Sequence, residues 1–181
     1  RWLANRYDQD VPALFDYNVY AVCGDGCLME GVGSEAASLA GHLGLDRLCW
    51  IYDNNHITIE GRTEITFTED VAMRFAAYGW KVLRVGDAND IALIEAALAT
   101  FRQTCGQPTL VILDSHIGWG SPHRQDTAAA HGEPLGEDEV RLVKRAYGWP
   151  EDAKFLVPDG VRAHFDAGLG SRGAAAPRAW E

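Results

Sequence analysis

Apolar residues along the chain form short continuous runs that alternate with longer segments of helical spacing. The strand-like runs are residues 18–23, 48–52, 80–85 and 109–113. The helix-like segments between them are residues 34–45, 69–78 and 91–101, the last with Asn89 and Asp90 as candidate caps. Strands that alternate with helices are typical of β-α-β units. The pattern therefore predicts an α/β fold with a mostly parallel sheet and helices on both faces.

The alternation ends after residue 114. Residues 115–136 are polar and rich in glycine, and a loop of that length is usually functional or disordered. A helix is expected over residues 137–147, with an acidic and solvated first turn at 137–139, and Pro150 ends it. Beyond it, residues 161–165 are amphipathic and the pattern is then lost. We therefore expect a domain segment over residues 1–150 and a helical C-terminal extension over 151–181.

Charge and composition exclude several classes of partner. The chain of 181 residues has 16 Lys and Arg against 26 Asp and Glu, a net charge of −10. An acidic protein is not expected to bind nucleic acid or anionic lipid, which attract clustered basic residues. No apolar run approaches the roughly 20 residues of a membrane span. A phosphorylated ligand would have to be held by something other than overall charge.

The start of the chain and its cysteines indicate its setting. Residues 1–6 have neither an initiator Met nor the apolar core of a signal peptide, so we expect a piece of a longer protein. The four cysteines lack the paired spacing of a zinc site. A reducing, cytoplasmic location is the expectation.

Two polar motifs follow the first two predicted strands. Gly24, Asp25 and Gly26 come directly after the first strand, and Asn55 lies 30 residues after Asp25, just beyond the second. That separation is about one strand-helix-strand unit, so both strand ends should meet at one edge of the sheet. Oxygen ligands suit Mg²⁺ or Ca²⁺, and glycine N–H groups can approach a phosphate closely. Each motif alone is a common turn, but together they favour a metal and phosphate site.

A second reading of the same region is a nicotinamide-binding site. Gly31, Gly33 and Ala36 match the loose pattern G-x-G-x-x-A, and Asp53 follows Gly33 by 20 residues, where a ribose-binding acid could lie. That pattern requires a strand immediately before its first glycine, and the preceding residues follow the predicted strand instead of forming it. The nicotinamide site is therefore the lesser alternative.

The sequence resembles the transketolase family of thiamine diphosphate enzymes. The residues that carry the resemblance, in order along nearly the whole chain, are 24–61, 77–80, 117–122 and 131–136. The resemblance implies a thiamine diphosphate-binding fold, of which the chain is an incomplete domain. It also implies a second domain, with residues 168–173 leading toward it.

The resemblance assigns roles to individual residues. Asp25, the side chain of Asn55 and the backbone carbonyl of Ile57 are implied to bind the metal. Gly26 and Asn55 are implied to contact the diphosphate. His131 matches a family histidine near the diphosphate and the donor substrate, which makes it the candidate catalytic residue.

Three further positions follow from the resemblance. Glu30 matches an acidic residue near the subunit interface, and Ile59 matches an apolar residue near the cofactor rings. The chain departs from the family before His131, where alanines occupy 128–130 in place of a polar pair. His56, His116 and His123 lie near the expected sheet edge but gain no role from the resemblance.

The implied activity is transfer of a two-carbon ketol unit from a ketose phosphate to an aldose phosphate, a reaction of the pentose phosphate pathway. The implied cofactors are thiamine diphosphate and Mg²⁺, with Ca²⁺ as the other metal candidate. The implied partner is a second subunit of a homodimer, or a pyrimidine-binding domain outside this chain. We therefore expect the isolated chain to be inactive. The alternatives are dihydroxyacetone synthase, another thiamine diphosphate enzyme, or a non-catalytic or split-enzyme subunit.

Overall fold

The computed structural model describes residues 2–7 and 15–180. The chain divides into two compact units. One spans residues 18–151 and contains the sheet, and the other is drawn from the two terminal segments. Each is described by itself.

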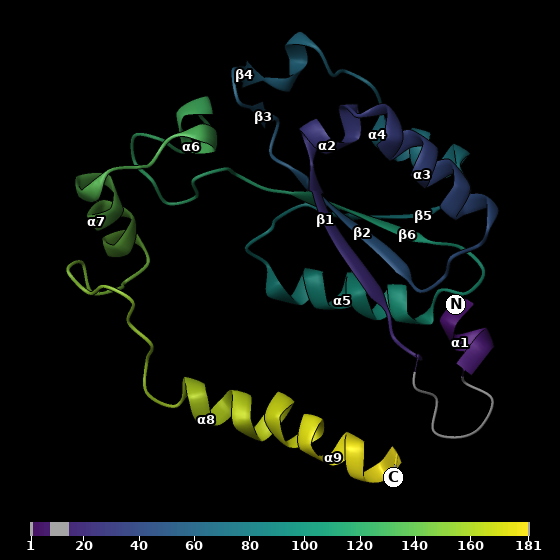
Figure 1. The fold of residues 1–181 in the computed structure, drawn as a ribbon. Helices are drawn as coiled ribbons and strands as arrows, with labels where there is room; N and C mark the ends of the chain where they lie inside the picture. Colours follow the sequence, from purple (N-terminus) through teal and green to yellow (C-terminus); the bar gives the residue numbers. More distant parts are fainter. Residues whose placement is uncertain (1, 8–14, 181) are drawn as a thin grey trace. The chain divides into compact units, whose positions relative to one another are not determined.

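The main sheet has four parallel strands in the order β1-β2-β6-β5 (Figure 1). The strands are β1 (Val19–Gly24), β2 (Leu48–Asn54), β5 (Lys81–Val85) and β6 (Thr109–Asp114). Each coincides with an apolar run of the sequence to within two residues. The predicted α/β class with a parallel sheet is confirmed.

Helices cover both faces of this sheet (Figure 1). The helices packed on one face are α2 (Asp25–Met29), α3 (Gly31–His42) and α4 (Val71–Ala77), and the helix on the other face is α5 (Ile91–Gln103). Alternate residues of β6 pack on opposite faces of the sheet. Leu110 and Ile112 belong to the core under α2, α3 and α4, and Val111 belongs to the core under α5. A strand buried on both faces needs apolar residues at every position, which explains the continuous run of β6, whereas the edge strand β1 is largely exposed despite its apolar run.

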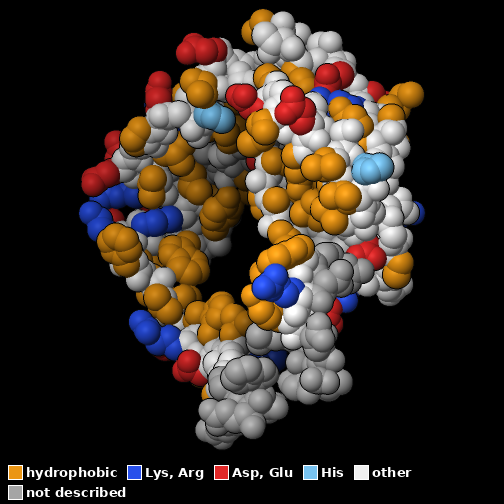
Figure 2. Space-filling model, turned by 45° about the vertical axis from the view of Figure 1, so that its right-hand side comes forward, with side chains coloured by type: hydrophobic (Ala, Val, Ile, Leu, Met, Phe, Trp, Pro, Cys, Tyr) orange, Lys and Arg blue, Asp and Glu red, His pale blue; other side chains and the backbone are white. Residues whose placement is uncertain are grey.

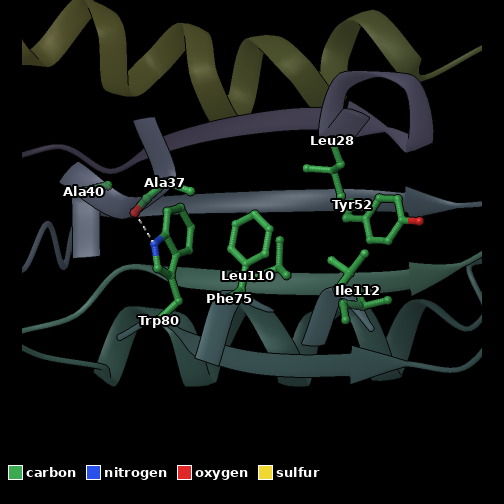
Figure 3. Close-up of a cluster of buried hydrophobic side chains, with 9 residues drawn as sticks. Leu28, Ala37, Ala40, Tyr52, Phe75, Trp80, Leu110 and Ile112 are labelled. Carbon is green, nitrogen blue, oxygen red and sulfur yellow. Dashed lines mark hydrogen bonds between the residues drawn. The ribbon is translucent and has the colours of Figure 1, made fainter. Parts of the chain in front are cut away.

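Aromatic packing fixes the larger of the two cores (Figure 3). Trp80 contacts Trp50 and Phe75 with ring centroids 5.1 and 5.2 Å apart. Its indole N–H donates to the carbonyl of Ala37 in α3 at 2.8 Å. This one side chain therefore ties α3 to α4 and β5 while keeping its only polar group satisfied.

Aspartate caps set the starts of α4 and α5. Asp70 accepts a hydrogen bond from the N–H of Met73, and Asp90 accepts one from Leu93. The cap predicted at Asp90 is confirmed. The helix expected over 34–45 begins and ends three residues earlier, as α3, because α2 ends at Met29 and leaves only Glu30 between the two helices.

The remaining elements of this unit are short. They are β3 (Ile57–Thr58), β4 (Gly61–Arg62), the 3₁₀ turn η1 (Thr63–Ile65), α6 (Ala128–Gly132) and α7 (Glu137–Ala146). β3 and β4 form a two-stranded antiparallel ribbon. The expected long loop thus includes the five-residue helix α6, and the helix expected over 137–147 is present as α7.

The terminal unit is helical. Its elements are α1 (Trp2–Tyr7), α8 (Val161–Phe165), the π-helical segment η2 (Asp166–Gly170) and α9 (Ser171–Trp180). Helical structure therefore continues where the amphipathic pattern is lost after residue 165. Among the residues that the structure describes, no helix has the length and apolar character needed to cross a membrane.

Candidate functional site

A pocket of about 770 Å³ opens at the carboxyl ends of β1 and β2. The segments that line it come from the β1 and β2 ends, α2, the β3–β4 ribbon, the start of the long loop and α6. The lining residues used below are Asp25, Gly26, Glu30, Asp53, Asn55, Ile57, Ile59, Ile117 and His131. Every predicted site residue therefore borders one pocket.

Parallel pairing explains why the two motifs meet. Gly24, the last residue of β1, is in register with Asp53 of β2. Asp25 starts α2 directly after β1, and Asn55 follows the end of β2. The carboxyl ends of neighbouring parallel strands lie at the same edge of a sheet, where α/β proteins bind ligands.

Asp25 is a buried carboxylate, and one of its two oxygens has no hydrogen-bond partner. Only 3% of the residue is exposed, and Oδ1 accepts a hydrogen bond from the Tyr52 hydroxyl at 2.5 Å. Oδ2 is buried without a hydrogen-bond partner. Burial raises the pKa of Asp25 above its usual value, although the hydrogen bond from Tyr52 opposes the shift. An unpaired carboxylate oxygen inside a protein is costly, and a bound cation would satisfy it.

Asn55 closes a tight turn after β2. Its Oδ1 accepts from the N–H of Ile57 at 2.9 Å, and its Nδ2 donates to Asp53 Oδ2 at 3.0 Å. The Ser115 hydroxyl donates to the other oxygen of Asp53. His56, which lies between Asn55 and Ile57 in the sequence, has a left-handed φ of 62°. The amide oxygen of Asn55 keeps a second lone pair, so it can bind a cation without breaking the turn.

The donor set fits a hard cation and an anionic group. Among the described residues, no three His, Cys, Asp or Glu side chains are grouped to hold a metal, so a metal here needs amide and carbonyl oxygens. Such oxygen donors with one carboxylate suit Mg²⁺ or Ca²⁺. Gly26 borders the pocket, and a Cβ at this position would project into open space. That space allows a ligand to approach the backbone.

Three outer positions complete the lining. His131 is an exposed residue of α6, and α6 packs against β3. Ile59 lies between β3 and β4 and is 67% exposed although it is apolar. Glu30 is exposed and separates α2 from α3. The opening of the pocket is thus lined by the imidazole of His131, the apolar side chain of Ile59 and the carboxylate of Glu30.

The alternative nicotinamide pattern does not have the required geometry. Gly31 and Gly33 lie in the first turn of α3, whereas β1 ends at Gly24 and α2 intervenes. The pattern therefore does not form the strand-to-helix turn that holds a dinucleotide pyrophosphate.

Comparison with known proteins decides the family. The family model described as "Transketolase, thiamine diphosphate binding domain" matches residues 1–181. The chain belongs to the transketolase family.

Individual transketolases are similar over nearly all of the chain. The transketolase of Geobacillus stearothermophilus is 47% identical over 180 residues, which are 99% of this chain and 27% of that protein. The structure of transketolase from Leishmania mexicana superposes with a TM-score of 0.91 at 38% identity, covering 98% of this chain and 26% of that one. Transketolase from Pichia stipitis, solved in complex with sedoheptulose 7-phosphate, gives a TM-score of 0.86 at 42% identity, covering 91% and 24%. The chain thus spans about a quarter of the length of these transketolases.

One contact of this transketolase-family chain contradicts the sequence interpretation. Glu139 was expected in a solvated first turn of α7, but only 9% of it is exposed. Its carboxylate accepts from the Ser121 hydroxyl, and from the N–H and Nδ1 of His123 at 2.9 and 2.8 Å. The hydrogen bonds from Ser121 and His123 lower the pKa of Glu139 to about 2. The contact anchors the loop between β6 and α6 to α7.

Two of the histidines near the sheet edge have structural partners outside the pocket. His123 bonds to Glu139, and Nδ1 of His116 lies 3.0 Å from both carboxylate oxygens of Asp126. Sequence reasoning also missed Tyr52, because a tyrosine in an apolar run indicates core packing. No local pattern shows that its hydroxyl reaches Asp25, which lies 27 residues earlier.

Proposed function

We propose that this chain is the cofactor- and metal-binding segment of a transketolase-type enzyme. That enzyme would transfer a two-carbon ketol unit from a ketose phosphate to an aldose phosphate with thiamine diphosphate as cofactor. The observation that carries the proposal is the buried, half-satisfied Asp25 beside Asn55, in a pocket of a transketolase-family chain. Membership of the family supports the reaction class, and the pocket supports the place where the cofactor binds.

The metal would be held by Asp25, the Asn55 side chain and the carbonyl of Ile57. Mg²⁺ fits this oxygen set, and Ca²⁺ is the second candidate. Gly26 and Asn55 would contact the diphosphate. A divalent cation between carboxylate and diphosphate explains how a chain with a net charge of −10 can bind an anionic cofactor.

The chain's own residues would position the reactants. When bound, thiamine diphosphate supplies a nucleophilic carbon and accepts the electron pair of the broken C–C bond. His131 would hydrogen-bond to the diphosphate and to the donor sugar, and it is the candidate for moving a proton at a sugar hydroxyl. Ile59 would pack against the cofactor rings and exclude water from that side.

A second subunit or a pyrimidine-binding domain would complete the site. Glu30 lies at the pocket opening, next to α3. Large apolar side chains are exposed on α3 and at its C-cap: Val32, Leu39 and Leu43 are 70%, 57% and 57% exposed. Polar residues of α3 are exposed as well, and Figure 2 shows hydrophobic side chains on the surface of the molecule. Exposed apolar surface of this kind is typical of a protein interface. We therefore expect a homodimer and no activity in the isolated chain. The expectation of a cytoplasmic location rests separately on the cysteines, which lack a paired spacing.

The test uses the full native protein that contains this chain. Ketol transfer from a ketose phosphate to an aldose phosphate is measured with and without thiamine diphosphate and Mg²⁺, beside calorimetric binding of the cofactor. We expect metal-dependent binding and turnover that a chelator abolishes. Preference for formaldehyde as acceptor would favour a dihydroxyacetone synthase, and cofactor binding without turnover would favour a non-catalytic or split subunit. Failure to bind the cofactor would overturn the proposal.

A further inference from the structure

We propose that Glu139 is a positioning residue, which holds the loop between β6 and α6 in one conformation and thereby keeps His131 at the cofactor pocket. The inference rests on the proposed function, because His131 is the candidate catalytic residue of that function. It goes further in giving a functional role to a carboxylate of α7 that does not itself line the pocket.

The segment beyond β6 has a polar centre in place of an apolar core. Of residues 115–151, all of which the structure describes, only Ser121 and Glu139 are buried, with 3% and 9% of each residue exposed. These two side chains are hydrogen-bonded to each other. A segment in which no apolar residue is fully buried gains little from the hydrophobic effect. Its conformation therefore depends on hydrogen bonds, and Glu139 is at their centre.

Glu139 joins α7 to two residues of the loop. Its Oε1 accepts from the Ser121 hydroxyl and from the N–H of His123 at 2.9 Å, and its Oε2 lies 2.8 Å from Nδ1 of His123. Ser121 Oγ accepts in turn from the N–H of Arg124 at 3.2 Å. Without the carboxylate, the buried Ser121 hydroxyl would lose its acceptor, and a buried polar group without a partner is costly.

Further contacts connect the loop to α6. The hydroxyl of Thr127, the N-cap residue of α6, donates to the carbonyl of Arg124 at 2.7 Å, and the carbonyl of Thr127 accepts from the N–H of Ala130 at 3.1 Å. Gly118 has a φ of 64° and lies so close to α6 that a Cβ there would be 3.1 Å from that of Ala130. A continuous path of contacts thus runs from Glu139 to the helix that contains His131.

His131 depends on this backbone for its position. Its side chain has no hydrogen-bond partner among the residues that the structure describes. Its helix, α6, packs against β3 (Figure 1) and against the loop at Gly118. Loss of Glu139 would weaken the second of these two supports. A catalytic group displaced by about 1 Å can lower the rate by about 100-fold, so a loosened loop should reduce turnover.

The experiment compares Glu139→Ala with the wild type in the full native protein that contains this chain. Steady-state kinetics measure kcat/KM for a ketose phosphate donor, and calorimetry measures binding of thiamine diphosphate with Mg²⁺. We expect kcat/KM to fall roughly 10- to 100-fold, the range that a misplaced catalytic group can cost. Cofactor affinity should fall less, because Asp25 and Asn55 lie at the ends of β1 and β2, outside the loosened segment.

A double-mutant cycle with His131→Ala separates positioning from a general loss of stability. If Glu139 acts through His131, Glu139→Ala should lower kcat/KM little further once His131 is already alanine, because residues that act as a unit are not additive. Equal fold-losses in the two backgrounds, or an unchanged kcat/KM in Glu139→Ala, would overturn the inference. Absence of cofactor binding in the wild type would instead overturn the proposed function.

Two variants on the same turn of α7 provide the controls. Glu139→Gln keeps an oxygen that can accept from the Ser121 hydroxyl and from the N–H of His123, so it should recover most of kcat/KM. Asp138→Ala removes the exposed carboxylate of the preceding residue and should leave kcat/KM unchanged. A loss in Asp138→Ala as large as that in Glu139→Ala would contradict the role of Glu139.

A further readout needs only the wild type. Hydrogen–deuterium exchange followed by mass spectrometry reports the protection of backbone amides in peptides covering residues 117–131. The N–H groups of Ser121, Asp126 and Ala130 each donate to a carbonyl within this range. We therefore expect these peptides to retain protected amides. Exchange as fast as that of an unfolded chain throughout the range would show that the loop is not held in one conformation, and would overturn the inference.

Discussion

Two aspartates at the same edge of the sheet have opposite surroundings. Asp114 ends β6, and Arg84 of β5 donates to both of its oxygens at 2.9 Å, while Asn54 donates at 2.7 Å. Asp25 follows β1 and accepts from the Tyr52 hydroxyl and, more weakly, from the backbone of His56, and neither group is a guanidinium or ammonium. Asp114 therefore has a cation within the protein, and Asp25 has none among its hydrogen-bond partners.

The pKa values follow this difference. Partial burial acts to raise the pKa of Asp114, but the hydrogen bonds from Arg84 and Asn54 outweigh it and lower the pKa. Burial raises the pKa of Asp25, and the hydrogen bonds from Tyr52 and from the backbone of His56 do not compensate for it. A carboxylate that the fold already neutralises contributes to structure, whereas one that the fold leaves partly unpaired is suited to an external cation.

Removing the charge of each aspartate in turn should give the largest difference in metal binding between the two sites. Asp25→Asn removes the only carboxylate of the proposed metal set. Loss of a residue that merely hydrogen-bonds to a metal ligand weakens metal binding about 10- to 100-fold, so loss of this ligand should lower the Mg²⁺ affinity by roughly 100-fold or more. Calorimetry with thiamine diphosphate present measures the loss. Thermal unfolding in a chelator should show no loss of stability, because a neutral amide relieves the buried charge.

Asp114→Asn is the matched change at the other aspartate. It removes the same charge from the same edge of the sheet and keeps an oxygen that can accept from Asn54. We expect cofactor and metal binding to stay within about twofold of the wild type. A large binding loss in Asp114→Asn, or wild-type binding in Asp25→Asn, would reverse the assignment of the two residues.

Removing the Asp114 side chain entirely should test its structural role. Asp114→Ala leaves the buried amide of Asn54, 6% exposed, without its acceptor, and such a loss costs about 1–3 kcal/mol of the free energy of unfolding. Arg84 contributes little, since its side chain is 63% exposed and can be hydrated. Urea unfolding checks the value. Asp114→Asn should recover most of the loss, and equal losses in the two variants would contradict the assigned role of Asn54.

Glu139 extends the comparison to a third carboxylate, also satisfied within the protein. Its pKa of about 2 lies below its usual 4.5, so the stabilisation is complete above about pH 4.5 and is lost as the pH falls toward 2. Glu139→Gln should therefore flatten the decline of the urea midpoint below pH 4.5. Asp138→Asn, on the same turn of α7, should leave that decline in place. An unchanged acid dependence in Glu139→Gln would be evidence against the anchor.

An exposed ion pair should give the smallest effect. Arg62 and Glu64 are 3.4 Å apart with side chains 58% and 70% exposed. Water and salt screen such a pair, so Glu64→Gln should change the free energy of unfolding by less than about 0.5 kcal/mol. Urea unfolding at two salt concentrations measures it. A larger change would show that side-chain exposure does not distinguish the carboxylates that stabilise the fold from those that do not.

Much of the fold could be predicted because its signals are local. The run at 109–113 became β6, and Asp90 caps α5, since strand burial and helix capping depend on neighbouring residues. The prediction that Glu139 lies in a solvated first turn of α7 is wrong, because the contacts that bury it are not local. Its partners, Ser121 and His123, lie 18 and 16 residues away in an irregular loop, and no periodicity reports such a contact.

The sequence alone determined that two polar motifs, 30 residues apart, would follow adjacent parallel strands, because one β-α-β unit has about that length. Only the tertiary structure decided which carboxylate is paired. Tyr52 reaches Asp25 across 27 residues and Arg84 reaches Asp114 across 30, through strand register and core packing. The two aspartates look alike in the sequence, since each follows an apolar strand. They differ because a cation stands beside one of them in the folded sheet and not beside the other.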